Sequence, residues 1–439
     1  MSNDLSYGFK ETELGPLPEE WEVVRLGEVI RKTKQADPRK TPEWRFKYVD
    51  VSAISNDSLC IQGYTEYNGT DTPSRARKLI EAGDVIFATV RPYLKRVAIV
   101  PSELAGHICS TAFCVIRVQP KKADPAYLFF AVSDDRFVQR VSGNQRGSSY
   151  PAVTDSDVLN ELIPLPPLPE QQEIGQALST IQQAMEAQGK IITAARELKN
   201  SLMRHLFTYG PVPLGQADQV PLKETEFGIA PARWRIMPLK DCAFVQTGAA
   251  KGRKFGDSLI VTVPYLRVAN VQDGYLDLSE IKHIHIRESE IERYRLQPGD
   301  VLLTEGGDFD KLGRGFVWQG QIPNCIHQNH IFAVRANRTV LLPEYLAYLV
   351  QSNYGKAYFL TVAHRTTHLA CINSAKLRSF PALIPDLSEQ ERIVRILGAV
   401  DCKIRTEEKR RTAFDTLFKT MLHHLMTGKI RVIEMTASV

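Results

Sequence analysis

The chain has 439 residues, of which 43% are hydrophobic and 24% are charged, a composition that supplies ordinary buried cores and excludes intrinsic disorder. Its formal net charge of +5 is too small for indiscriminate binding to nucleic acid, but it allows basic patches on one face. The sequence has no apolar run of about 18 residues and no charged-then-apolar signal pattern at its start, so we expect a cytoplasmic protein.

Seven cysteines, an odd number, are scattered within apolar stretches. This usage is typical of buried thiols in a reducing compartment and not of a disulfide framework. Cys109 and Cys114 do not have the spacing of a zinc knuckle, and His327 and His330 lack a cysteine or carboxylate at ligand spacing. We therefore expect no metal site.

The chain contains a tandem duplication, because three landmarks occur twice in the same order. They are Glu11–Gly15 with Trp21, which returns as Glu224–Gly228 with Trp234, then Gly83-Asp84-Val85, which returns as Gly299-Asp300-Val301, and Glu170-Gln171, which returns as Glu389-Gln390. The separation grows from 213 to 219 residues along the chain. Each copy is too long for a solenoid repeat and must be a complete domain with an appendage.

Both copies begin with a β-rich region of short apolar runs separated by Gly, Asp and Pro. In the first copy the predicted strands lie at 47–51, 85–89 and 112–116, and a helix starts at Pro125. In the second copy they lie at 264–268, 301–303 and 331–334, and a helix starts at Pro343. The fold class is therefore α+β, with domains expected at 1–165 and 210–386.

Each domain is followed by a predicted long amphipathic helix with a near-heptad apolar seam. We place these helical spacers at 166–209, after a Pro-rich hinge, and at 387–428, with a tail at 429–439. The seam positions are Ile174, Leu178, Ile181, Ile192, Leu198, Leu202, Ile393, Leu397, Val400, Ile404, Leu417 and Met421. We expect the two helices to pack as an antiparallel coiled coil with pseudo-two-fold symmetry. The alternative is that each helix folds back on its own domain.

Two β-rich domains, each followed by a Pro-containing step and a long helix that opens with Glu-Gln, resemble the specificity subunit of type I restriction-modification systems. The steps are 165–171 and 384–390, and the segments 304–315 and 325–330 are similar to segments of one group of such domains. The resemblance spans nearly the whole chain. It departs from symmetry in one respect, since the first step is richer in proline.

The resemblance implies a subunit without catalysis, in which each target-recognition domain reads one half of a split DNA sequence. It implies that the helices set the spacing and dock two methyltransferase subunits, to which restriction-translocase subunits attach. S-adenosylmethionine, ATP and Mg²⁺ are then expected on the partners and none on this chain. We take Glu170, Gln171, Glu389 and Gln390 as the candidate docking residues.

Clusters of basic residues beside Gly, Ser, Thr and Tyr indicate loops suited to a DNA groove. The candidates in the first domain are Arg31, Lys34, Arg91, Tyr93, Lys95, Arg96, Arg146, Ser148, Ser149 and Tyr150. Those in the second are Lys251, Arg253, Lys254, Arg267, Gly306, Gly307, Lys311, Arg314, His327, Gln328, Asn329, His330, His364, Arg365 and Thr367. Base contacts are assigned to Arg96, Arg146, Arg253, Gln328 and Asn329, because these side chains suit guanine or adenine edges. The alternative is that they are solvated loop charges.

Motifs for catalysis are missing from the sequence. It has no P-loop or dinucleotide fingerprint, and no Asn/Asp-Pro-Pro-Tyr/Phe step of the kind that an adenine methyltransferase uses on a flipped base. The segment from Asp308 lacks the acidic twelfth position of a calcium loop. Two other interpretations stay open, namely a coiled-coil scaffold or regulatory DNA-binding protein, and a tandem nuclease with carboxylates that spacing does not reveal.

Overall fold

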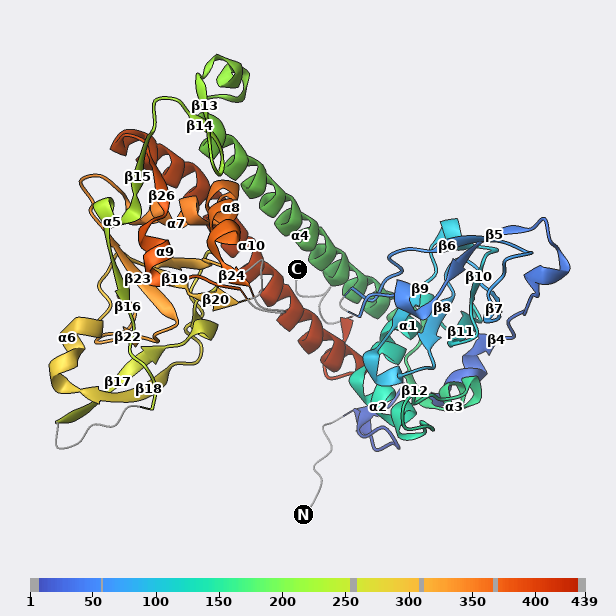
Figure 1. Ribbon diagram of the computed structural model, residues 1–439. Helices are drawn as coiled ribbons and strands as arrows, with labels where there is room; N and C mark the ends of the chain where they lie inside the picture. The colour runs from blue at the N-terminus through green and yellow to red at the C-terminus, as the bar shows by residue number, and fades with distance from the viewer. Residues whose placement is uncertain (1–7, 57, 253–258, 308–311, 366–369, 433–439) are drawn as a thin grey trace. The chain divides into compact units, whose positions relative to one another are not determined.

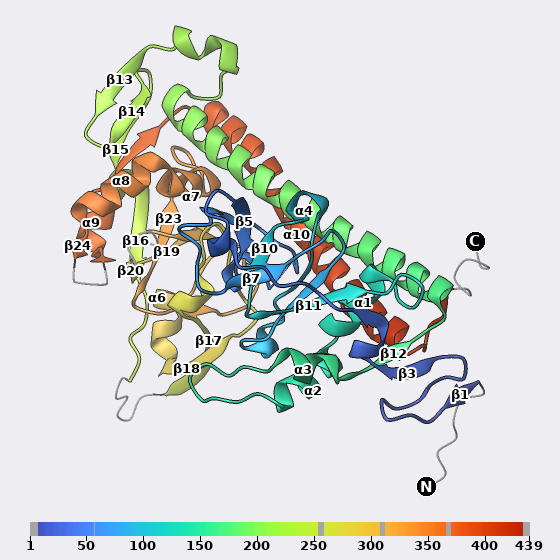
Figure 2. The same ribbon diagram turned by 90° about the vertical axis from the view of Figure 1, so that its right-hand side faces the viewer.

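The computed structural model describes residues 8–56, 58–252, 259–307, 312–365 and 370–432 (Figures 1 and 2). The chain forms two compact units, Met1–Ile191 with Glu407–Val439, and Ile192–Thr406. Each unit contains one β-rich domain and a stretch of both long helices. The expected α+β class, with two tandem domains and two long helices, is confirmed.

In the first unit two four-stranded sheets form the domain, in the orders β6-β5-β10-β7 and β4-β11-β8-β9. Strands β5 and β10 are parallel, and the other pairs in these two sheets are antiparallel. Two small sheets, β1-β2 and β12-β3, complete the unit. The strands are β1 Phe9–Lys10, β2 Leu17–Pro18, β3 Glu22–Arg25, β4 Ile30–Arg31, β5 Arg45–Val49, β6 Thr65–Asn68, β7 Ala76–Leu79, β8 Val85–Ala88, β9 Val97–Ile99, β10 Ile108–Ser110, β11 Phe113–Val118 and β12 Leu162–Leu165.

Strands β8 and β11 are buried along their whole length, as expected for continuous apolar runs covered on both faces. Helices α1 Pro125–Ser133, α2 Asp135–Gly143 and α3 Asp155–Leu159 follow. The predicted helix start at Pro125 is confirmed, and Asp124 caps it by accepting a hydrogen bond from the backbone N–H of Tyr127 at 2.9 Å. Proline at the first helical position loses no intrahelical hydrogen bond.

The second unit has the sheets β16-β23-β19-β21, β18-β17-β22, β15-β26, β13-β14 and β20-β25-β24. Strands β17 and β22 are parallel, as β5 and β10 are in the first unit. The strands are β13 Leu222–Thr225, β14 Gly228–Pro231, β15 Arg235–Pro238, β16 Ala243–Thr247, β17 Ile260–Leu266, β18 Lys282–Arg287, β19 Asp300–Thr304, β20 Gly306–Gly307, β21 Gly315–Val317, β22 Ile326–His327, β23 Ile331–Ala336, β24 His364–Arg365, β25 Ala370–Cys371 and β26 Pro381–Ile384. The helices are α5 Leu239–Cys242, α6 Ile291–Tyr294, α7 Pro343–Gln351, α8 Asn353–Val362 and α9 Ser374–Arg378.

The segment expected to be a hinge is fixed by a strand in both units. Strand β12 pairs with β3, and β26 pairs with β15 in the same antiparallel way. The proline content of 163–169 therefore marks a strand that leads directly into a helix and not a loose connection.

The two long helices are α4 Leu168–Tyr209 and α10 Leu387–Met426. In the first unit, Ile174 and Leu178 share one core cluster with Leu425 and Met426, and further along Gln188 binds Glu407. Residue numbers rise along α4 as they fall along α10, so the helices run antiparallel, as Figure 1 shows. In the second unit Lys199 pairs with Asp401 at 2.7 Å in the same sense.

The seam residues do not all pair helix with helix. Ile174 and Leu178 belong to the core of the first domain, and Ile393 and Leu397 to that of the second. Helix pairing and packing on a domain, treated above as alternatives, therefore both occur. Ile192 and Ile404 are buried, whereas Ile181, Leu202, Val400 and Met421 are half-buried.

Two helix-pairing assignments are wrong, because Leu198 is 52% exposed and Leu417 is 44% exposed. Within the described ranges, no helix is long and apolar enough to cross a membrane.

Candidate nucleic-acid interface

In the first domain the fold brings together two basic loops that lie far apart in the sequence. The loop after β8 pairs with the loop after α2 through an antiparallel bridge between Val90 and Ala152, and Ala152 also bridges to Arg146. The backbone N–H of Arg91 donates to the carbonyl of Pro151 at 2.8 Å. Two predicted clusters thus form a single surface.

Large exposed side chains cover this surface. Tyr93 is 50% exposed, Tyr150 is 74% exposed, and the guanidinium of Arg91 lies 5.1 Å from the centre of the Tyr150 ring. Ser148 and Ser149 are exposed beside them, and Arg146 keeps a 71% exposed side chain although it approaches Asp157. Aromatic rings, hydroxyls and guanidinium groups are the side chains that contact DNA phosphates and bases.

The same loop has an unusual backbone. Arg91 and Lys95 both have φ near 50°, in the left-handed region that side chains with a Cβ seldom adopt. Between them Pro92–Leu94 forms a short 3₁₀ turn with Pro92 buried. Such strain persists only where the surrounding structure enforces it, and it is concentrated at functional loops.

Other first-domain candidates are engaged within the protein. Arg96 donates to the Val51 carbonyl at 2.8 Å and to the Asn56 side chain at 3.1 Å, and Lys95 pairs with Asp135. Arg31 donates from Nε to the carbonyl of Val118 at 3.1 Å but remains exposed, as does Lys34. The base contact assigned to Arg96 is a prediction that the geometry does not favour.

The second domain repeats the construction at equivalent positions. Gly306 pairs with Cys371, and Cys371 pairs with His364, in the sheet β20-β25-β24. Gly306 matches Val90 and Cys371 matches Ala152 in the duplicated sequence. The same backbone arrangement therefore carries different side chains in the two domains.

Further main-chain hydrogen bonds gather the remaining second-domain candidates. The N–H of Asn329 donates to the carbonyl of Ala249 at 3.1 Å, which places Gln328 and Asn329 beside the turn that carries Lys251. The N–H of Glu305 donates to the carbonyl of His330 at 2.9 Å, and the side chains of His330 and Glu305 meet at 2.5 Å. Lys251, His330 and His364 are exposed, and Gln328, Asn329, Gly306, Gly307 and Arg314 are half-buried.

The assignment of His327 to DNA contact is wrong. Its side chain is 0% exposed, and neither ring nitrogen has a hydrogen-bond partner among the described residues. Burial lowers the pKa of His327 to about 4, because a charged ring is costly in an apolar environment. His327 is thus a neutral core residue beneath the candidate surface.

The side chains of five second-domain candidates are not described by the structure, and a sixth candidate, Arg267, is engaged within the protein. Arg253, Lys254, Lys311 and Thr367 lie outside the described residues, and so does the side chain of Arg365. Arg267 is half-buried and pairs with Glu280 at 2.9 Å.

An ion pair with a buried aspartate joins neighbouring strands at equivalent places in the two domains. Asp84 accepts two hydrogen bonds from Arg117, at 2.8 and 2.7 Å, and Asp300 accepts two from Arg335, at 2.8 and 2.9 Å. Asp84 holds the pKa of Arg117 above its usual value. Sequence reasoning missed these pairs, although the duplicated Gly-Asp-Val step contains both aspartates.

The Glu-Gln steps are not docking surfaces, so this assignment is corrected. Glu170, Gln171 and Gln390 are 3%, 1% and 0% exposed, and the Glu389 side chain is 12% exposed. Glu170 accepts a hydrogen bond from Nε1 of Trp21, and Glu389 from Nε1 of Trp234, each at 3.0 Å.

Both glutamines connect their helix to the same place in their own domain. Gln171 accepts from the N–H of Asp124 at 3.0 Å and donates to the carbonyls of Lys122 and Pro166. Gln390 accepts from the N–H of Leu342 at 2.8 Å and donates to the carbonyls of Val340 and Pro385. In each copy, therefore, the Trp and the Glu of the Glu-Gln step, which recur in the sequence as landmarks, contact each other in the structure.

A duplicated β-rich domain with exposed basic and aromatic loops, followed by a long helix, defines a two-domain DNA-recognition protein. Residues 18–195 and 231–413 match the model of the type I restriction modification DNA specificity domain. The chain belongs to this family, whose part in a restriction-modification system is recognition and not catalysis.

Known proteins agree with this assignment. The MjaVIII specificity subunit of Methanocaldococcus jannaschii is 25% identical, over 97% of this chain and 96% of that protein. The MjaX specificity subunit of the same organism is 27% identical, but the match covers 47% of this chain and 48% of that protein. A solved chain from a study of complex assembly and conformational transition of the type I R-M system is 29% identical, with a TM-score of 0.53 over 94% of this chain and 99% of that one.

Proposed function

We propose that the two domains of this chain read different halves of a split DNA target. The first domain would use the surface of Arg91, Tyr93, Arg146 and Tyr150. The second would use the surface of Lys251, Gln328, Asn329 and His364. The two long helices connect the domains and set the number of base pairs between the halves.

One observation carries this proposal. The bridge between Val90 and Ala152 has its counterpart in the pairing of Gly306 with Cys371, so the two loop scaffolds share their backbone pairing. The side chains on and beside them differ, with exposed Tyr and Arg on one, and exposed His with half-buried Gln and Asn on the other. Because arginine favours guanine and Asn or Gln favours adenine, equal scaffolds with unequal side chains suit two different half-sites.

The test is a binding selection from random DNA with the assembled complex. Arg146→Ala should relax the preference at one half-site by about 1–3 kcal/mol per lost base contact, and Asn329→Ala should do so at the other. Lys121→Ala, an exposed residue outside both surfaces, is the control. If both substitutions altered the same half, or neither half, the assignment of one domain to each half would be wrong.

For partner docking we propose a surface that the duplication repeats. Leu198 and Leu417 are equivalent positions, both on the exposed side of their helices. Small exposed residues flank them at matching places, Ala194 and Ser201 beside Leu198, and Ala413 and Thr420 beside Leu417. A leucine among small side chains allows close approach of another helix. Two equal surfaces suit two copies of one partner, which we take to be the methyltransferase subunit.

The remaining partners follow from this role. Restriction-translocase subunits would join through the methyltransferases, with S-adenosylmethionine, ATP and Mg²⁺ bound on those partners. The complex would act in the cytoplasm, where the cellular DNA is methylated.

A further inference from the structure

The carboxylates at the starts of the two long helices are each paired with an arginine, and the two arginines come from different parts of the chain. In the first unit Arg431, which follows α10, donates to both oxygens of Glu170, from Nε at 2.6 Å and from a terminal nitrogen at 3.0 Å. The other terminal nitrogen of Arg431 donates to Glu20 at 3.1 Å. Arg431 thus joins the region after α10 to the start of α4.

In the second unit the arginine belongs to the domain itself. Arg233 precedes Trp234 and pairs with Glu389. In the duplicated sequence the position of Arg233 corresponds to Glu20 in the first domain, and the position of Arg431 corresponds to Val212. The charge at the domain position is therefore reversed, and the cation is supplied from the helix end instead.

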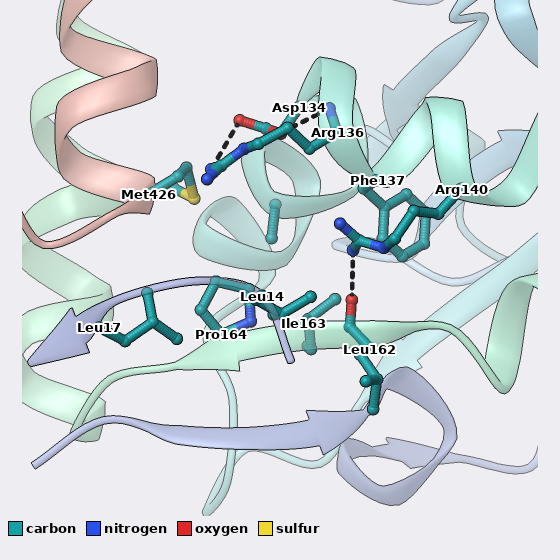
Figure 3. Close-up of a pocket in the computed structure, with 11 residues that line it drawn as sticks. Leu14, Leu17, Asp134, Arg136, Phe137, Arg140, Leu162, Ile163, Pro164 and Met426 are labelled. Atoms are coloured by element: carbon teal, nitrogen blue, oxygen red, sulfur yellow. Dashed lines mark hydrogen bonds and ion pairs between the residues drawn. The ribbon is translucent and has the colours of Figure 1, made fainter. Parts of the chain in front are cut away.

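The chain around Arg431 is packed, not merely near Glu170. Gly428 has φ +64°, and a Cβ there would lie 2.3 Å from Cγ of Pro18, so a side chain is excluded at this close approach. Val432 is buried in the core cluster of the first domain, and Ile430 packs against that cluster. Figure 3 shows Met426, at the end of α10, lining one pocket with Leu17 and Pro164.

The matching segment of the second unit behaves differently. Its helix is also followed by a glycine of positive φ, Gly210, which lies one position after the counterpart of Gly428. Pro211 is still buried, but Leu214 is 78% exposed, and none of the described residues 212–219 belongs to the core cluster of the second domain. In the second unit the burial after the helix thus ends at Pro211, whose carbonyl accepts a hydrogen bond from Arg392, whereas in the first unit it continues to Val432.

We propose that residues 427–432 form a C-terminal latch that seats the first domain on the helix pair, with Arg431 as its positioning residue. The second domain needs no such latch, because Arg233 holds Glu389 from within. The expected effect of the latch on DNA recognition rests on the proposed function. A loosely seated first domain would misplace one half-site and leave the other unchanged.

The charge balance explains why Arg431 matters. Glu170 is 3% exposed, and without Arg431 its carboxylate would keep one neutral donor, Trp21, with the like charge of Glu20 nearby. A buried carboxylate that loses its cation is strongly unfavourable. Releasing the latch would return Glu170 to water, so loss of Arg431 favours the released state.

Hydrogen exchange of the full-length chain tests the latch. Arg431→Val, which installs the residue found at the matching position, should raise exchange across 423–432 roughly ten- to hundredfold, the size expected for losing charge-assisted hydrogen bonds. Exchange across 204–212, the matching segment of the second unit, should not change and is the internal control. Unchanged exchange across 423–432 would overturn the latch.

A second variant transplants the arrangement of the second unit into the first. Glu20→Arg combined with Arg431→Val should recover most of the lost protection, because the arginine introduced in place of Glu20 can then hold Glu170 as Arg233 holds Glu389. If residues 423–432 exchanged as fast in the double variant as in Arg431→Val alone, the role assigned to the charges would be wrong. If Arg431→Val fails to accumulate, Arg431→Lys retains the charge without the bidentate geometry and should give an intermediate increase.

DNA selection with the same variants separates the latch from the proposed function. Arg431→Val should weaken the preference at the half-site of the first domain and spare the other. Faster exchange with both half-sites weakened equally would keep the latch and reject the division of the target between the domains.

Discussion

The side-chain amide of Gln188 donates a hydrogen bond to the carboxylate of Glu407, and the two residues are counterparts in the duplicated sequence. They lie 219 positions apart, as do Glu170 and Glu389. Both are buried, at 4% and 1% exposure. Two helices of duplicated sequence that pack antiparallel are related by a local two-fold axis. A residue of one helix contacts its counterpart in the other helix only at that axis. A polar pair at that point specifies the register of the two helices.

Gln188→Ala should therefore lower the free energy of unfolding by about 1–3 kcal/mol, because Glu407 remains buried with a lost donor. Denaturant titration of the full-length chain measures this. The exposed Gln172 on the same helix provides the control, and Gln172→Ala should change stability by less than about 0.5 kcal/mol. An equal loss in both variants would mean that the pair does not stabilise the helix register.

Leu198→Arg and Leu417→Arg should each weaken binding of one methyltransferase subunit, and the double variant should bind none. A charge placed in an apolar contact typically costs on the order of 2 kcal/mol or more, and both sites are exposed, so the thermal stability of the chain alone should not fall. Native mass spectrometry counts the bound subunits. Lys190→Ala, at an exposed position of α4, should retain two of them. Full occupancy in the double variant would place docking elsewhere.

His327 makes the second unit sensitive to acid. Its pKa is lowered to about 4 in the folded protein from 6.5, so between these values only the unfolded chain takes up the proton. Stability should be unaffected by this group above about pH 6.5 and should fall as the pH decreases toward 4, by roughly 3 kcal/mol in total.

His327→Leu should remove this part of the pH dependence. Denaturant titrations of both proteins at pH 7 and pH 4.5 give the difference, and the variant should lose less stability on acidification. Parallel losses in the two proteins would show that His327 takes up its proton without unfolding.

Cys371 offers a chemical probe of the second-domain surface. It is exposed, as is Cys402 on α10, whereas Cys109 and Cys114 are buried, and burial raises the pKa of Cys109 to about 12. Thiol reagents should therefore modify Cys371 and Cys402 first. A bulky adduct on Cys371 should lower DNA affinity at least about tenfold if it displaces one base contact, and bound DNA should slow its modification.

The Cys402→Ser variant isolates that effect. Its DNA affinity should match the parent before modification and fall in the same way after it. If DNA does not slow the modification of Cys371, and complete modification does not lower the affinity, β25 does not lie at the interface.

The sequence by itself determined the duplication, the α+β class, the two long helices and the basic loops. These features depend on local periodicity and on repeated order, which a chain carries without reference to its partners in space. Landmarks such as Trp21 and Glu170 occur twice, and they mark real structural contacts, although the docking role assigned to Glu170 was wrong.

Only the tertiary structure decided which residues are buried and what they touch. His327, Glu170 and Gln390 are polar and read as surface groups, yet long-range packing encloses them, while Leu198 and Leu417 follow the apolar period and face outward. Periodicity gives the side of a helix but not what covers that side. Pairings such as Val90 with Ala152, or Arg431 with Glu170, join residues far apart in the chain, and no local pattern encodes such a distance.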